Sequence, residues 1–408
     1  KKERRKTKEG EKKKEERKKK KEEEKKEEEK KKEERKKKEK GRRKNKKEKG
    51  RRKKWKPNEN QKKEEKKGRS YTKNLAEDYA AYTCEFIRKE TGEEKPLENL
   101  KIVIDAGNGA AGFFADKVIE ALGGNSEGSQ FLNPDGDFPN HVPNPEAKEA
   151  IESIKKAVLD NNADFGIIFD ADGDRSAFID NKGREINRNN LIALLSDILL
   201  KQTPGATIVT DSVTSAGLKK FIENHGGKHH RFKRGYKNVI NEAKRLNEEG
   251  IYTPLAIETS GHAAFINNYF LDDGAYMAAL LLIQLVKSKK EGVNFTDILN
   301  EVEEAAEEKE IRFTIKAEDF RSEGNKVLEA LGEYAGNVKG WEIETPNYEG
   351  VRIICDGNSW FLLRLSLHEP LLCLNIETGE KGKIEEIQGQ IYEFLKDFDK
   401  VDTTPIKK

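Results

Sequence analysis

Two patterns of hydrophobic residues recur along this chain: apolar residues three or four positions apart, and short continuous apolar runs. The places where one pattern gives way to the other mark the boundaries of the expected helices and strands. Apolar residues three or four positions apart predict amphipathic helices, and they occur in residues 71–91, 113–122, 146–159, 191–200, 216–223 and 384–398. Short apolar runs predict buried strands, and they occur in residues 102–104, 165–169, 207–210 and 255–257. These helices and strands alternate from residue 101 to residue 258, which is typical of α/β domains with parallel strands.

The strand pattern dominates after residue 306. Strand-like segments occur at residues 312–315, 350–354, 360–366 and 371–376, before the last predicted helix. We therefore expect successive α/β domains with mixed sheets and a smaller C-terminal α+β domain. The expected boundaries are residues 71–100 for a connecting helix, 101–186 and 187–305 for the α/β domains, and 306–408 for the C-terminal domain.

Residues 1–70 have no such pattern, because their only residue of the apolar set is Trp55. They hold 40 Lys+Arg against 18 Asp+Glu, so their net charge is +22. The rest of the chain has a net charge of −18, which leaves +4 for the whole chain. This composition cannot bury enough apolar surface to form a core. We expect a solvated, Lys/Glu-rich low-complexity arm, with a tether to RNA or to an anionic membrane surface as the alternative. The lack of interleaved aromatic residues argues against RNA.

The remaining composition indicates a cytoplasmic protein. The longest apolar run, residues 277–286, is interrupted by Gln284 and is shorter than the ~20 residues of a membrane-spanning helix. Cys84, Cys355 and Cys373 lie far apart without metal-site spacing, which is typical of reduced thiols. No secretory signal is visible, and a first residue that is Lys rather than Met is typical of a fragment.

An acidic loop follows the apolar run 165–169. Asp170, Asp172 and Asp174 stand at alternate positions, where their charges repel one another unless a cation lies between them. A ligand set made only of oxygens suits a hard divalent ion such as Mg²⁺, and the absence of a Glu at the twelfth loop position excludes an EF-hand. The alternative is a surface turn in which Arg175 pairs with one aspartate.

A glycine-rich turn follows the strand at residues 102–104. Gly107, Gly109 and Gly112 have the spacing of a dinucleotide-binding turn. No acidic residue clearly ends a following strand to bind a ribose, so we favour a tight turn into a helix over nicotinamide binding.

Two further polar groups lie near predicted strand ends. Glu258-Thr-Ser-Gly-His262 combines a carboxylate, a hydroxyl and an imidazole, which can bind sugar hydroxyls and move a proton, or can simply cap a turn. Arg364 and Ser366 are expected on the turn between two strands, where a guanidinium beside a hydroxyl can hold a phosphate.

These segments, in this order, resemble the α-D-phosphohexomutase family, the phosphoglucomutases and phosphomannomutases. The resemblance rests on Asp105-Ala-Gly-Asn-Gly109, Asp170-Ala-Asp-Gly-Asp-Arg175, Glu258-Thr-Ser-Gly-His262 and Arg364-Leu-Ser366. It implies Mg²⁺ on the three aspartates, Arg175 beside the reactive centre and proton transfer by His262. The implied substrate contacts are Lys233, Arg234, Gly235, Tyr236, Glu258, Ser260, Arg364 and Ser366. The family usually has a small residue and Thr where this chain has Leu367 and His368. We therefore expect the His368 imidazole to replace the Thr as a hydrogen-bond donor to the bound phosphate.

The family moves a phosphate between O1 and O6 of a hexose through a phosphorylated serine, with glucose 1,6-bisphosphate as an activator. The resemblance implies this Mg²⁺-dependent interconversion of hexose phosphates. The serine's loop, Thr-x-Ser-His-Asn-Pro, and the first domain that bears it have no counterpart among these residues. We therefore expect the chain to bind hexose phosphate without isomerising it.

Two other functional classes stay open. The segment Ile-Ile-Phe-Asp170-Ala-Asp172-Gly is similar to the nucleophile strand of haloacid-dehalogenase-type phosphatases, although Asp174 and Arg175 argue against that class. The other is a non-catalytic protein that binds sugar phosphates or polyanions, including nucleic acid. No motif distinguishes glucose phosphates from mannose phosphates.

Overall fold

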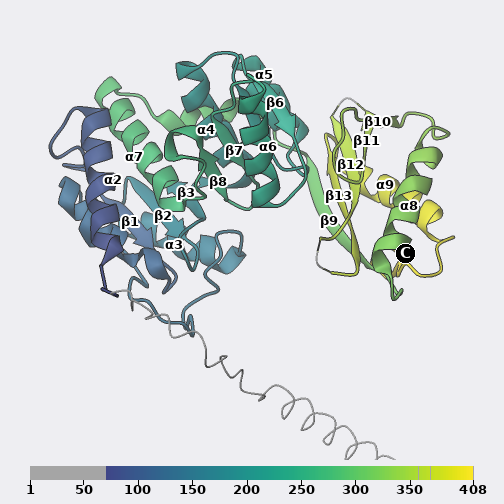
Figure 1. The fold of residues 1–408 in the computed structure, drawn as a ribbon, viewed down its shortest axis with the longest axis horizontal. Helices are drawn as coiled ribbons and strands as arrows, with labels where there is room; N and C mark the ends of the chain where they lie inside the picture. Colours follow the sequence, from purple (N-terminus) through teal and green to yellow (C-terminus); the bar gives the residue numbers. More distant parts are fainter. Residues whose placement is uncertain (1–69, 357, 368, 408) are drawn as a thin grey trace, which may run out of the picture. The chain divides into compact units, whose positions relative to one another are not determined.

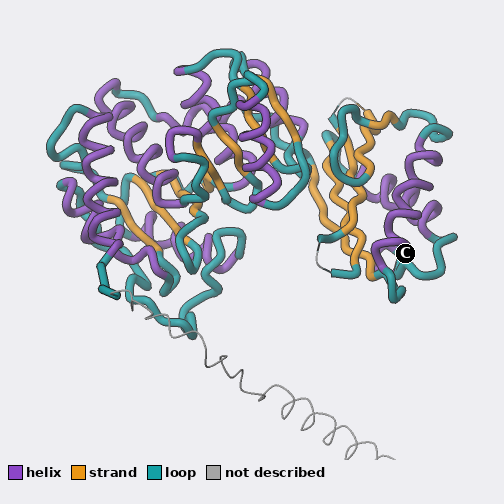
Figure 2. The backbone as a smooth tube through the Cα atoms, viewed as in Figure 1, coloured by secondary structure: helices purple, strands orange, loops and turns teal. Residues whose placement is uncertain are grey.

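The computed structural model describes residues 70–356, 358–367 and 369–407 (Figure 1). The predicted arm, residues 1–70, lies outside the described residues apart from Ser70, and so does His368. Residues Lys73–Lys408 form one unit by their internal contacts. This unit contains three sheets, and helices pack beside each of them (Figure 2).

The first sheet has the strand order β1-β2-β3-β4. Its strands are β1 (Ile102–Asp105), β2 (Phe165–Phe169), β3 (Ser176–Asp180) and β4 (Glu185–Ile186). β1 and β2 are parallel, whereas β3 is antiparallel to both of its neighbours, so the sheet is mixed. Every residue of β1 and β2 is buried, which explains why β2 and the first three residues of β1 are apolar runs.

Helices cover both faces of this sheet. α3 (Lys148–Asp160) packs on one face, where a Cβ added to Gly166 would lie only 2.3 Å from Val158 Cγ2. The other face belongs to a larger core that includes residues of α2 (Leu75–Thr91) and α7 (Gly274–Glu291). The predicted helix 113–122 forms as an irregular helical stretch: a 3₁₀ turn (Ala110–Gly112) leads into it, residues 113–114 are α-helical, and a π-helical turn (Ala115–Ile119) and a second 3₁₀ turn (Glu120–Leu122) complete it. A Cβ at Gly112 would meet the Leu132 carbonyl oxygen at 1.8 Å, so this position requires glycine.

The second sheet has the order β6-β5-β7-β8. It consists of β5 (Thr207–Thr210), β6 (Lys228–Arg231), β7 (Leu255–Ile257) and β8 (Ala263–Phe265). β5 is parallel to β6 and β7, and β8 is antiparallel. The helices of this region are α4 (Arg188–Gln202), α5 (Ala216–Asn224) and α6 (Tyr236–Glu248). The sequence analysis predicted neither β6, which is a polar edge strand, nor α6, whose buried residues Val239, Ile240, Ala243 and Leu246 do have helical spacing.

The third sheet is antiparallel throughout. Its order is β10-β11-β12-β13-β9, with β9 (Glu307–Thr314), β10 (Glu342–Ile343), β11 (Val351–Asp356), β12 (Ser359–Leu365) and β13 (Leu371–Thr378). Residues of α8 (Phe320–Ala335) and α9 (Lys383–Leu395) share one hydrophobic core with this sheet. Three short 3₁₀ segments complete the described fold: Ile266–Asn268, Phe295–Glu301 and Thr404–Ile406.

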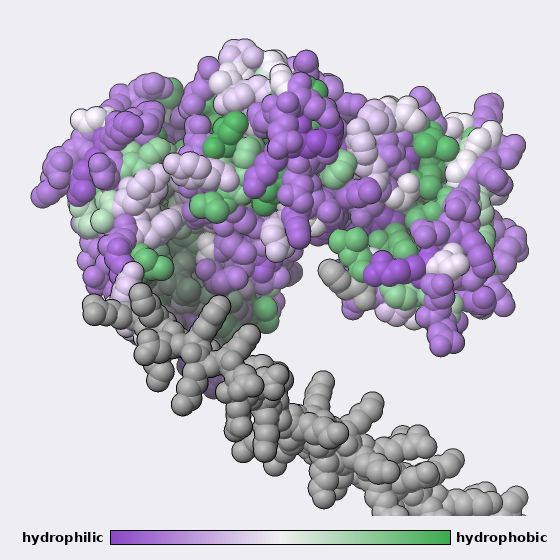
Figure 3. All heavy atoms as spheres, in the orientation of Figure 1, coloured by the Kyte–Doolittle hydropathy of each residue, from purple (hydrophilic) through white to green (hydrophobic). Residues whose placement is uncertain are grey.

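The predicted fold class is confirmed, since two mixed α/β sheets are followed by an antiparallel sheet with two helices. Most of the surface visible in Figure 3 is hydrophilic, and the hydrophobic residues there are scattered. In the described part of the chain, no helix is both long and apolar enough to cross a membrane.

Candidate functional site

The acidic loop begins where β2 ends. One oxygen from each of Asp170, Asp172 and Asp174 lies within 4.8 Å of the others. Gly173 has φ +84°, a left-handed conformation that favours glycine and allows the tight turn. Asp170 is almost fully buried, and its Oδ1 accepts hydrogen bonds from the amides of Gly173 (3.0 Å) and Arg175 (3.1 Å). These hydrogen bonds to the Asp170 carboxylate therefore fix the conformation of the loop.

Arg175 pairs with Asp170, as the alternative interpretation of the loop predicted. Its Nε donates to Asp170 Oδ2 at 2.8 Å, and its Nη1 donates to Asn144 Oδ1 at 3.3 Å. Both oxygens of Asp170 thus accept hydrogen bonds. This arrangement does not favour Asp170 as a free nucleophile, and it is compatible with a cation that contacts the remaining carboxylate lone pairs.

The surroundings of Asp174 show whether the acidic loop could hold a cation. Its Oδ1 is buried and accepts no hydrogen bond, which is costly for a carboxylate. Burial, and then the charge of Asp170, raise the pKa of Asp174 to about 6. A divalent cation among the three aspartates would satisfy this oxygen and offset the repulsion, so the residues present fit a hard metal ion.

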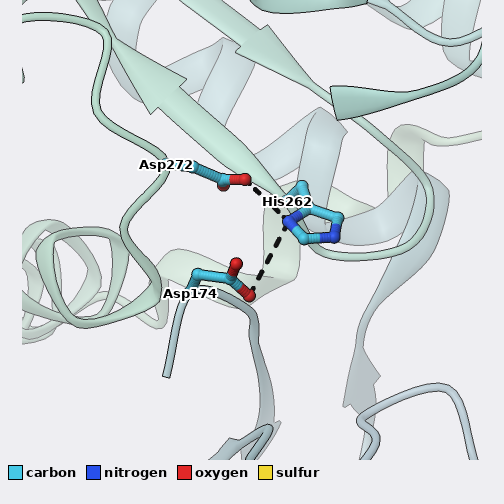
Figure 4. A group of neighbouring side chains, drawn as sticks. All are labelled: Asp174, His262 and Asp272. Carbon is cyan, nitrogen blue, oxygen red and sulfur yellow. Dashed lines mark hydrogen bonds and ion pairs between the residues drawn. The ribbon is translucent and has the colours of Figure 1, made fainter. Parts of the chain in front are cut away.

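His262 lies between two carboxylates (Figure 4). Its Nδ1 is 2.8 Å from Asp272 Oδ2 and 3.8 Å from Asp174 Oδ1. Burial lowers the pKa of His262, but the hydrogen bond to Asp272 and the nearby negative charges outweigh it, so the pKa is raised. A backbone bridge between Arg175 and His262 joins the acidic loop to the segment 258–262.

The glycine-rich turn contacts the acidic loop directly. A Cβ at Gly109 would lie 2.6 Å from the Ala171 carbonyl oxygen, and the amide of Ala110 donates to that oxygen at 2.8 Å. The turn, which follows β1, therefore packs against the acidic loop, and this close approach explains Gly109 without any bound dinucleotide.

Glu258 and Ser260 lie on the loop that follows β7. Glu258 is buried, and its Oε1 accepts a hydrogen bond from the amide of Gly235 at 2.6 Å. Burial, and then the charge of Asp211, raise the pKa of Glu258 to about 7. Ser260 Oγ is buried and has no hydrogen-bond partner among the described residues.

The basic turn, residues 233–236, meets this loop. Tyr236 stacks on His262, with ring centroids 5.1 Å apart and an interplanar angle of 28°. Arg234 Nε lies 3.8 Å from Asp211 Oδ2. Lys233 is exposed. The structure thus brings Gly235 to Glu258, Tyr236 to His262 and Arg234 to Asp211.

The predicted phosphate-binding residues lie at the end of β12. Arg364 is in the strand itself and not on the turn, which corrects the sequence interpretation, because its backbone pairs in register with Cys373 of β13. Its side chain is buried, and its Nε has no hydrogen-bond partner among the described residues. Ser366 begins the turn, where its Oγ accepts a hydrogen bond from the Glu369 amide at 3.3 Å. His368, the third predicted donor, is outside the described residues.

The sequence did not identify two acidic residues of this site. Asp272 holds His262, and Asp211 is fully buried and accepts a hydrogen bond from Thr259 Oγ1 at 2.7 Å. Asp211 follows β5 as Asp170 follows β2, and this position at a strand end was a signal that could have found it. Nothing in the sequence near Asp272 provides a comparable signal.

Some buried polar atoms of these residues have no hydrogen-bond partner. They are Asp174 Oδ1, Asp211 Oδ1, Ser260 Oγ and Arg364 Nε, four of the eight such atoms in the described part of the chain. Because buried polar groups are normally hydrogen-bonded, a polar ligand could complete the bonding of these four.

Family models and known proteins were compared with the whole chain. The models that match are phosphoglucomutase/phosphomannomutase alpha/beta/alpha domain II, over residues 70–183, and domain III, over residues 187–305. A phosphomannomutase/phosphoglucomutase of Pseudomonas syringae pv. tomato is 35% identical over 298 residues, which are 73% of this chain and 60% of that protein.

Two further proteins show the same similarity. A phosphoglucomutase of Neisseria meningitidis serogroup A is 30% identical over 80% of this chain and 66% of its own length. The crystal structure of a phosphoglucomutase/phosphomannomutase family protein from Burkholderia thailandensis matches with a TM-score of 0.64 and 28% identity, covering 77% of this chain and 64% of that one. This chain therefore spans about three fifths to two thirds of the length of these relatives.

Proposed function

Since this chain belongs to the α-D-phosphohexomutase family, the phosphoglucomutases and phosphomannomutases, we propose that residues 70–407 bind a hexose phosphate beside a divalent cation. The observation that carries this proposal is the set of unpartnered buried polar atoms at Asp174, Ser260 and Arg364. These atoms belong to the three segments that would bind a metal ion, a sugar hydroxyl and a phosphate.

Asp170, Asp172 and Asp174 would hold Mg²⁺, whose charge offsets the negative charge of a phosphoryl group. Arg175 is fixed on both sides, by Asp170 and by Asn144, so its guanidinium stays beside this loop at little entropic cost. The binding of a cation is supported by the buried Oδ1 of Asp174, which accepts no hydrogen bond.

His262 would exchange a proton with a sugar hydroxyl. Asp272 accepts the hydrogen bond of Nδ1, which leaves Nε2 to take up or release the proton. Tyr236 stacks on the ring and restricts its rotation. Glu258 and Ser260 would bind the hydroxyls of the sugar, and Arg364 with Ser366 would bind the phosphate that does not react.

The family reaction needs a phosphoserine that donates the phosphoryl group, and the motif that carries it does not occur in the 408 residues. We expect these residues alone to bind hexose phosphate and not to isomerise it, since loss of a covalent nucleophile removes several orders of magnitude in rate. Formation of glucose 6-phosphate from glucose 1-phosphate, with Mg²⁺ and glucose 1,6-bisphosphate present, would show that another residue performs this step.

Calorimetric titration of glucose 1-phosphate with Mg²⁺ present tests the proposal. The wild-type chain should bind with a dissociation constant of roughly micromolar to millimolar, and Arg364→Ala should abolish binding because it removes the charge-assisted phosphate contact. Lys326→Ala, which removes an exposed cation of the same domain, should leave binding unchanged. Equal affinity of wild type and Arg364→Ala would contradict the proposal.

A further inference from the structure

The backbone of the basic turn already holds two carboxylates. The amide of Arg234 donates to Glu349 Oε2 at 3.1 Å, and the next amide, that of Gly235, donates to Glu258 Oε1 at 2.6 Å. Gly235 has φ +112°, a conformation that favours glycine. Successive amides arranged in this way attract anions, so the turn depends on these two side chains for its shape.

Glu349 reaches this turn from the C-terminal domain. It lies on the loop between β10 and β11, and the same Oε2 accepts a hydrogen bond from Ser212 Oγ. The preceding residue, Tyr348, packs on Phe232 with ring centroids 5.0 Å apart. The loop therefore contacts the second α/β domain through a carboxylate and an aromatic ring.

Gly350, the next residue, contacts the phosphate-binding strand. Its φ is +58°, and a Cβ there would lie 2.2 Å from the Leu363 carbonyl oxygen and 2.8 Å from Arg364 Cα. Only a residue without a side chain can approach Arg364 so closely. Glu349 and Gly350 thus join the basic turn to Arg364 within two residues of chain.

Buried charged residues also join the C-terminal domain to the second α/β domain around this loop. Arg352 of β11 stacks over Trp360, 3.4 Å from the ring centroid, and its Nη1 donates to the Ser212 carbonyl oxygen at 2.8 Å. Glu344 accepts a hydrogen bond from Arg231 Nη1 at 2.8 Å. Because each buried charge has a partner, removing one would be costly, and the loop that carries Glu349 is held in place.

We propose that Glu349 and Gly350 are positioning residues, which hold Arg364 in place relative to the basic turn and so favour ligands that contact both, such as a hexose phosphate. The proposal rests on the proposed function, because it assumes that Arg364 binds the phosphate and that the turn binds near the sugar. A ligand that spans both ends gains from the fixed spacing, since the two contacts are formed without further ordering. A ligand that contacts Arg364 alone gains no affinity from this fixed spacing.

Glu349→Ala tests this coupling. The affinity for glucose 1-phosphate should fall about ten-fold or more, which is the loss expected for a hydrogen bond to a charged group. The affinity for inorganic phosphate, measured by displacement, should stay within about two-fold. Glu349→Gln, which keeps an acceptor oxygen, should restore most of the glucose 1-phosphate affinity, and Glu329→Ala, which removes an exposed carboxylate of α8, should have no effect.

A double-mutant cycle gives a second measurement. In an Arg364→Lys background, which keeps a positive charge but loses the planar guanidinium, Glu349→Ala should cause a smaller loss of glucose 1-phosphate affinity than it causes in the wild type, because the guanidinium that Glu349 positions is gone. If Glu349→Ala does not fold, Glu349→Asp carries the same test, since it keeps the charge and shortens the reach. Melting curves of each variant establish that it is folded.

The possible outcomes separate the two proposals. Failure of the wild type to bind glucose 1-phosphate refutes the proposed function. Binding by the wild type with an unchanged affinity in Glu349→Ala overturns the positioning role. Equal losses for glucose 1-phosphate and inorganic phosphate also overturn it, because they would show that Glu349 supports only the fold around Arg364.

Discussion

Glu258→Gln should stabilise the free protein at alkaline pH. Glu258 is 4% exposed, and burial with the charge of Asp211 raises its pKa from 4.5 to about 7. A glutamine has nearly the same shape, and its oxygen can still accept the hydrogen bond from Gly235. The substitution therefore removes the cost of a buried negative charge and keeps the packing.

The sign of the pH dependence follows from the raised pKa. Below pH 4.5 the carboxyl is protonated in both the folded and the unfolded chain, so the charge costs nothing. Between 4.5 and about 7 the unfolded chain loses this proton first, so the free energy of unfolding falls as the pH rises. Above this window the wild type has lost about 3 kcal/mol, as each pKa unit corresponds to about 1.4 kcal/mol.

Urea unfolding at about pH 5 and pH 8, with EDTA present, measures this effect. The advantage of Glu258→Gln over the wild type should grow by roughly 2 kcal/mol between the two conditions. Glu329→Gln, at an exposed position of α8, serves as the control and should show no such growth. The reasoning is refuted if the difference between Glu258→Gln and the wild type is the same at both pH values, or shrinks.

Two further predictions concern other parts of the chain. His141 Nε2 lies 3.1 Å from both oxygens of the fully buried Asp105, so His141→Gln should lower the free energy of unfolding by roughly 3 kcal/mol near pH 6, measured by urea unfolding. The hydrogen bond to Asp105, assisted by the charges of Asp105 and Glu149, raises the pKa of His141, so this loss should be largest below the usual histidine pKa and should shrink as the pH rises through the raised value. Deletion of residues 1–69 should change the melting temperature by less than about 5 °C, because their composition includes a single residue of the apolar set, Trp55; a larger fall would show that the arm packs on the rest.

The sequence predicted those elements whose burial is local and continuous. β2 was predicted with its observed bounds because all five of its residues are buried, and β5 likewise because all four are. The acidic residues 170, 172 and 174 come directly after β2, so this loop could be proposed as a metal site from its position after an apolar run.

The other parts depend on contacts between distant segments, which a single sequence does not reveal. Asp211 meets Thr259 across 48 residues, and Glu349 meets Arg234 across 115. β6 is polar because it lies at an edge, so its Lys-His-His-Arg composition gave no strand signal. The candidate site residues could therefore be proposed from the sequence, whereas the residues that hold them in place could not.

The most direct test of the central claim, that metal ion and hexose phosphate share one site, is the ³¹P relaxation of glucose 1-phosphate with Mn²⁺ in place of Mg²⁺. Because Mn²⁺ is paramagnetic, it should broaden the ³¹P resonance strongly in the presence of the wild-type chain. The effect should fall to the level of a protein-free solution in the Asp172→Asn, Asp174→Asn double variant, which removes two of the three clustered carboxylates. Equal broadening with the wild type and the double variant would contradict the account.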